Sequence, residues 1–128
     1  MGLAPLQVPP DVSEAVAEIL RNQISGAKNV VLVERQRLVD LKRELGIQYS
    51  DLADPATAVR LGRAAGARKM IFGSLSRLGT TYTITVRMVD VETGTIDGFR
   101  GVECLECREE DLPAAAAALK EPLVGFGR

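Results

Sequence analysis

Between residues 10 and 66 the apolar side chains recur mainly every three or four positions, which is the period of an amphipathic helix. This pattern predicts helices over residues 11–24, 34–45 and 55–65. The first has Asp11 at its start and Glu14 three residues later, as in a capping box. The third starts at Asp54-Pro55, because Asp caps a helix and Pro gives up an N–H that would be unpaired anyway.

After Gly66 the period shortens to two, which indicates strands. Three strands are predicted, over residues 69–78, 81–91 and 95–104. The middle strand alternates strictly, so it is antiparallel and half-solvated, and its apolar face holds Tyr82, Ile84, Val86 and Met88. Gly79-Thr80 forms the tight turn before it, while Gly98 and Gly101 indicate a bulge in the last strand.

Two shorter strands and a last helix complete the pattern. The sequence VVLV at residues 30–33 is a β-branched run too short for a helix, so it predicts a strand buried on both faces. Residues 3–8 predict a strand in which Pro5 is tolerated mainly at an edge or a bulge. The acidic run 109–111 suits the first turn of the last helix, which Pro122 is expected to end.

These elements predict one α/β (α+β) domain over residues 1–128, in the order β-α-β-α-α-β-β-β-α. A mixed sheet of about five strands is expected, with the helices packed mainly on one face. The chain of 128 residues, 46% of them apolar, is of the size that forms one hydrophobic core.

Composition argues against several classes of function. Sixteen Lys and Arg balance seventeen Asp and Glu without forming a basic patch, which argues against nucleic-acid binding. No apolar run approaches the ~20 residues of a membrane span, and the first ten residues lack the features of a signal peptide. The chain has no His, which removes His-based triads and zinc ligand sets, and no cofactor is predicted.

Several short pieces, taken in order, carry a resemblance to a known family. They are Glu34-Arg35 after a buried strand, Glu44 on the following helix, Leu61-Gly62 before Gly66-Ala67, Gly73-Ser74, and the segment Val89 to Gly94. With them, residues 11–120 resemble the CsgG-like curli-secretion lipoproteins, a family that is also similar to the penicillin-binding-protein activator (LpoB-like) lipoproteins and to the N-terminal domain of TolB. None of these pieces is a catalytic signature.

The resemblance implies a non-enzymatic accessory module of the bacterial cell envelope, in secretion, outer-membrane assembly or regulation of a cell-wall synthase. It implies envelope protein partners, a periplasmic location with an outer-membrane anchor on an upstream segment, and leaves a homo-oligomer open. Pore-forming relatives carry long membrane-spanning hairpins, whereas the turns at Gly79-Thr80 and 92–94 are too short for such strands, so pore formation is not expected. An exposed sheet edge, such as the first strand, is the expected binding element.

Cys104 and Cys107 form a C-x-x-C motif between the last strand and the last helix. One interpretation is a thiol-disulfide oxidoreductase, which needs a lowered thiolate pKa. The surrounding acidic residues disfavour the thiolate, and two thiolates are only half of a zinc site. A second interpretation is a structural disulfide, which requires the chain to turn between the two residues, and a third is a pair of free thiols.

Three further groups of residues each have two interpretations, one as a binding site and one as a purely structural feature. The segment 73–79 is Gly-rich but lacks the lysine of a phosphate-binding loop, so its glycines are expected to serve backbone geometry. The acidic group Asp90, Glu92 and Asp97 lacks the spacing of a calcium loop, which favours turn chemistry. The basic residues of 60–69 are expected to form a solvated face, with binding of an anionic partner as the alternative.

Overall fold

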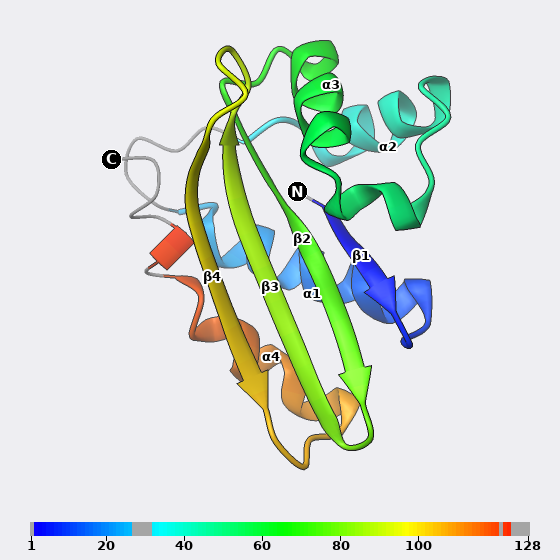
Figure 1. Cartoon of the computed structure of the whole chain (residues 1–128), viewed down its shortest axis with the longest axis vertical. Helices are drawn as coiled ribbons and strands as arrows, with labels where there is room; N and C mark the ends of the chain where they lie inside the picture. Colours follow the sequence, from blue (N-terminus) through cyan, green and yellow to red (C-terminus); the bar gives the residue numbers. More distant parts are fainter. Residues whose placement is uncertain (1, 27–31, 121, 124–128) are drawn as a thin grey trace.

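The computed structural model describes residues 2–26, 32–120 and 122–123, and its centre is a mixed sheet (Figure 1). The strands are β1 (Gly2–Leu6), β2 (Lys69–Leu78), β3 (Thr81–Asp90) and β4 (Ile96–Cys104). They lie side by side in this order; β1 is parallel to β2, and the other two pairs are antiparallel. The predicted mixed sheet is therefore confirmed, including the strand that contains Pro5.

The described part of the chain has four strands where about five were expected. The missing one is the predicted strand at 30–33. Residues 30 and 31 lie outside the described residues, and Leu32 and Val33 have no regular secondary structure. Both side chains are partly buried and pack against apolar clusters, so these two residues contribute to packing and not to strand pairing.

Helices α1 (Pro10–Ile24) and α4 (Leu112–Ala117) cover one face of the sheet. In Figure 1 they pass behind the strands. Their apolar side chains share a buried cluster with the apolar face of β3; this cluster includes Leu3, Val16, Leu20, Ile24, Leu75, Ile84, Val86, Leu112 and Ala116. The predicted inward face of β3 is thus confirmed.

Helices α2 (Arg35–Glu44) and α3 (Pro55–Ala65) pack on the opposite face, at one end of the sheet. Their cluster includes Phe72, whereas the first cluster includes Leu75, and residues three apart on a strand point to opposite faces. The helices therefore divide between both faces, instead of packing mainly on one. A short 3-10 helix, η1 (Tyr49–Ala53), connects α2 to α3.

The local sequence predicts the bounds of α3 more accurately than those of α1. Asp54 caps α3 by accepting the Ala56 backbone N–H, and Gly66 ends the helix at a φ of +71°. The predicted capping box of α1 is wrong, because the helix begins one residue earlier, at Pro10, and Asp11 lies inside its first turn. The N-cap residue is Pro9, which has no polar side chain, so no side-chain cap forms there.

The last helix is also shorter than predicted. The acidic residues form a 3-10 turn, η2 (Glu109–Asp111), and α4 ends at Ala117, before Pro122. In β4 the pairing register shifts where Met88 faces Gly98 and Val89 faces Ile96, so Asp97 is the extra residue of a bulge beside Gly98. This confirms the irregularity that the glycine predicted.

Candidate protein-binding surface

On the sheet face that α2 and α3 cover at one end, the described helices leave the rest of the surface uncovered. We call this surface the open face; its residues are Ser74, Ser76, Leu78, Thr81, Thr83, Thr85, Arg87, Ile96, Phe99, Gly101 and Glu103. All of them are at least partly exposed, and in Figure 1 no helix passes in front of the lower part of these strands. The face is mostly made of small polar side chains, with apolar side chains at its rim.

Phe99 is the largest apolar group on the open face. Its side chain is 50% exposed, and the Arg87 guanidinium lies over the ring, 5.3 Å from the ring centre. Ile96 and Leu78 add two more exposed apolar groups on the same face, with Leu78 at the hairpin end. Aromatic and arginine side chains of this kind are typical of the centres of protein interfaces.

Strand β4 forms an edge of the sheet, because it pairs with β3 alone among the strands that the structure describes. Antiparallel pairing directs alternate backbone groups of an edge strand outward, where they can pair with another chain. Among the described residues, the Phe99 carbonyl accepts a hydrogen bond from the Arg100 guanidinium at 2.8 Å. The nine residues of β4 are all exposed or only partly buried.

The other edge, β1, was the expected binding element, and the structure favours β4 instead. Leu3 and Ala4 of β1 are buried, and the Ser13 hydroxyl donates a hydrogen bond to the Leu3 carbonyl. The weak alternation and the two glycines of residues 95–104 were the signals in the sequence that this strand packs little.

Cys104 and Cys107 are joined by a disulfide between the end of β4 and η2. The two Cα atoms lie 5.6 Å apart, because the chain turns at Glu106, which has a φ of +52°. The Cys107 backbone N–H donates to the Thr80 carbonyl at 2.9 Å and holds this turn against the β2–β3 hairpin. The pair thus has the geometry of a structural link, whereas nothing in the fold supports the oxidoreductase alternative.

Replacing both cysteines with serine is expected to lower the free energy of unfolding by about 2 kcal/mol. Without the disulfide the unfolded chain gains conformational entropy, and the gain is small because the disulfide closes so short a loop. Urea unfolding with and without a reductant measures it. The reduced native protein should match the serine variant, and reductant should not change the variant. Two titratable thiols in the unfolded, unreduced protein would contradict the disulfide.

The acidic group at the β3–β4 turn is organised by a lysine. Lys69 Nζ lies 3.1 Å from Asp90 Oδ2 and also contacts the Asp97 carboxylate. Asp90 Oδ1 accepts the backbone N–H groups of Glu92 and Thr93, both at 3.0 Å. These contacts are those of a turn, and no three His, Cys, Asp or Glu side chains gather as a metal site within the described ranges.

This turn predicts an acid-sensitive contribution to stability. The Thr93 backbone N–H, and then the Lys69 ammonium, lower the pKa of the Asp90 carboxyl to about 2, from an ordinary value of 3.8. A lowered folded-state pKa stabilises the fold above pH ~4, and this contribution is lost as the pH falls from ~4 towards 2. Urea midpoints measured across this range should therefore fall less steeply in Asp90→Asn than in the native protein.

The control for this experiment is Asp40→Asn, which removes an exposed carboxylate on α2, remote from the turn. It should leave the acid slope of the native protein unchanged. Parallel acid slopes in the native protein and Asp90→Asn would show that the turn does not hold the carboxylate as described.

The Gly-rich segment serves the backbone, as expected. Gly73 lies in the middle of β2, and Gly79 lies in the hairpin turn at a φ of +63°. Neither glycine lies between a strand and a helix, where a phosphate-binding loop is found. In the same way, Gly62 lets α3 approach the sheet, because an added Cβ would lie 2.6 Å from a methyl group of Val91.

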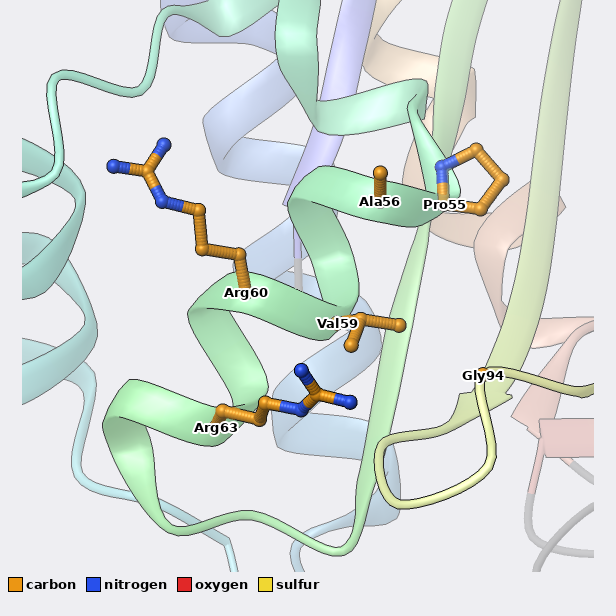
Figure 2. Close-up of a pocket in the computed structure, with 6 residues that line it drawn as sticks. All are labelled: Pro55, Ala56, Val59, Arg60, Arg63 and Gly94. Carbon is orange, nitrogen blue, oxygen red and sulfur yellow. The ribbon is translucent and has the colours of Figure 1, made fainter.

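The basic residues of 60–69 do not act together. Lys69 is bound in the turn described above, while the Arg60 guanidinium donates to the Leu45 carbonyl at 3.2 Å. Arg63 lies beside an open hollow of about 490 Å³ between α3 and the β3–β4 turn, as Figure 2 shows. Pro55, Ala56, Val59, Arg60 and Gly94 also line this hollow.

None of the helices in the described part of the chain is long and apolar enough to cross a membrane.

Comparison with known proteins identifies the family. The model of the curli production assembly/transport component CsgG matches residues 6–84. Among solved structures, the LpoB C-terminal domain from Salmonella enterica has a TM-score of 0.62 at 21% identity, covering 80% of this chain and 77% of that one. The LpoB C-terminal domain from Escherichia coli has a TM-score of 0.62 at 23% identity, with the same coverage of 80% and 77%.

The NMR structure of E. coli LpoB has a TM-score of 0.65 at 25% identity, and the match covers 78% of this chain but 51% of that one. None of the curated proteins compared with this chain matches it in sequence. The family match covers more than half of the chain, and the structural matches agree with it in fold. The chain belongs to the CsgG family, with the fold of the LpoB C-terminal domain.

Proposed function

We propose that this chain is a non-catalytic accessory domain of the bacterial cell envelope that acts by binding another protein. Family membership and the LpoB-like fold support this role. The role that fits them best is regulation of a cell-wall synthase from the periplasmic side, with an anchor in the outer membrane on an upstream segment. The short connections between the antiparallel strands, residues 79–80 and 91–95, favour this role over a pore, because each spanning strand needs ~9–11 residues.

The observation that carries the proposal is the combination of the open face with β4, an edge strand of the sheet that the structure describes. An extended segment of the partner can pair with β4 through backbone hydrogen bonds, and its side chains then lie against the open face. Phe99 and Arg87 are the expected anchors of that contact, because the ring is already oriented by the guanidinium. This mode of binding needs no cofactor and no reactive group.

The test is capture of partner proteins from an envelope extract, with Phe99→Glu compared with the native chain. We expect a partner to be captured by the native chain and its recovery to fall at least ~10-fold with Phe99→Glu, because a carboxylate then faces the partner at the centre of the contact. Arg37→Glu, which also places a carboxylate at an exposed position but on α2, is the control and should capture the partner normally.

Two further readouts decide between the classes of function. The Cys104→Ser/Cys107→Ser variant should capture the same partner, and the native chain should not reduce insulin. Fractionation should recover the native protein with the envelope. A cytoplasmic location, or a partner whose recovery is equal with Phe99→Glu and the native chain, would overturn the proposal.

A further inference from the structure

The surface of α3 and the turn after β4, at opposite ends of the sheet, differ in charge. Helix α3 contains Arg60 and Arg63 and no acidic residue, while the β3–β4 turn at the same end contains Asp90, Glu92 and Asp97. Residues 103–111, at the end of β4 and in η2, contain five acidic residues and one basic residue. Figure 1 shows α2 and α3 at one end of the strands and the chain that follows β4 at the other. The basic surface of α3 therefore complements in charge the acidic turn of a second copy placed end to end.

A hollow lies beside α3. Its wall is apolar at Pro55, Ala56 and Val59, and Figure 2 shows the Arg63 guanidinium extending along it towards the β3–β4 turn. Arg60 extends away from the hollow in the same view and is bound to the Leu45 carbonyl. The Arg63 guanidinium has no ion pair or hydrogen bond to any residue that the structure describes. An apolar wall beside a free guanidinium suits an apolar side chain flanked by a carboxylate.

The acidic end presents such a group. Leu105 lies at the tip of the turn closed by the disulfide, and its side chain is 69% exposed. Glu106 follows it, with Glu103 just before the turn, and both are exposed. The disulfide and the hydrogen bond from Cys107 N–H to Thr80 fix the turn. A turn held in this way loses little conformational freedom when it binds.

We propose that the Leu105 turn of one copy docks in the Arg63 hollow of the next copy, with Glu106 pairing with Arg63. The two surfaces differ, so each copy keeps one free turn and one free hollow, and the copies associate head to tail. A contact between one turn and one hollow is small and therefore weak, and its ionic part is screened by salt. The association is therefore expected to depend on protein concentration and on salt, and it does not use the open face.

Sedimentation velocity tests the proposal between about 20 μM and about 1 mM chain, at low salt of about 0.02 M and at about 0.5 M. The average mass should rise above the 13.8 kDa of the monomer with concentration at low salt and return towards it at high salt. Arg63→Glu and Glu106→Arg should each weaken association at least ~10-fold, because like charges then meet. Leu105→Ser should weaken it as well.

The decisive sample is an equal mixture of Arg63→Glu and Glu106→Arg. Each variant repels itself, whereas every contact between the two kinds pairs opposite charges, so the mixture should associate as the native chain does. All three substituted side chains are exposed, and circular dichroism verifies that the variants are folded. A monomer under all conditions, association that survives Arg63→Glu, or a mixture that stays monomeric would each overturn the proposal.

Discussion

Gly73→Ala is expected to destabilise the fold by at least about 3 kcal/mol, at the upper end of the cost of overpacking. A Cβ at Gly73 would lie 1.8 Å from the Thr85 carbonyl oxygen, 2.8 Å from the carbon of the same carbonyl and 3.1 Å from the Val86 Cα. All three atoms belong to the backbone of β3, so no side chain can rotate away. Relief requires β2 and β3 to separate where Gly73 pairs with Val86, in the middle of the sheet.

Urea unfolding measures the loss, and Gly101→Ala is the matched control. Gly101 also lies in a strand of the same sheet, but its added Cβ would meet nothing closer than 3.6 Å, from the Ile84 carbonyl. Its effect should stay under about 1 kcal/mol, because alanine there creates only ordinary contacts. Equal stability of the two alanine variants would show that β2 and β3 are not packed as described. The difference between the two variants is easy to observe, because the total free energy of unfolding of a domain is only ~5–15 kcal/mol.

The elements that the sequence predicts well are those with a local physical signal at both ends. Helix α3 has an Asp-Pro start and a Gly stop, and the structure gives the predicted bounds, Pro55–Ala65. Strand β2 also agrees, because a two-residue turn with glycine follows it directly. The buried face of β3 was readable from strict alternation alone.

Features that depend on distant parts of the chain were predicted less well. The apolar run at 30–33 has the composition of a buried strand, yet Leu32 and Val33 pack against helices without pairing, which no local pattern reveals. The face on which each helix packs is likewise set by its tertiary contacts with β2, and not by the local sequence of the helix. The sequence held one hint in β2. At one end of this strand, Met70 and Phe72 add apolar side chains to the second face, so that only this end is apolar on both faces.

The candidate binding surface was only partly predictable for the same reason. An exposed edge was expected, but at β1, because Pro5 restricts that strand to an edge. Which edge is free depends on what packs against it, and Leu3 of β1 is buried under α1. The open face is defined by the absence of a helix over half of β2–β4, which only the three-dimensional arrangement shows.

The second large effect is expected at Phe72, whose replacement by alanine should cost about 3–5 kcal/mol. The ring is 2% exposed and lies in the cluster that joins α2 and α3 to the sheet, so its removal leaves a cavity among Leu38, Leu61 and Val89. Phe99 is the matched control, because it lies on the same sheet face but is 50% exposed. Phe99→Ala should cost less than about 1 kcal/mol, since little burial is lost.

Thermal unfolding and partner capture together separate the roles of the two rings. The melting temperature should fall by roughly 10–20 °C with Phe72→Ala and by a few degrees with Phe99→Ala. Capture of the envelope partner should show the opposite order at a temperature where both variants are folded, because only Phe99 is exposed to the partner. Comparable losses of stability in both variants would mean that the open face is covered in the folded protein, and the surface assigned to binding would then belong to the core.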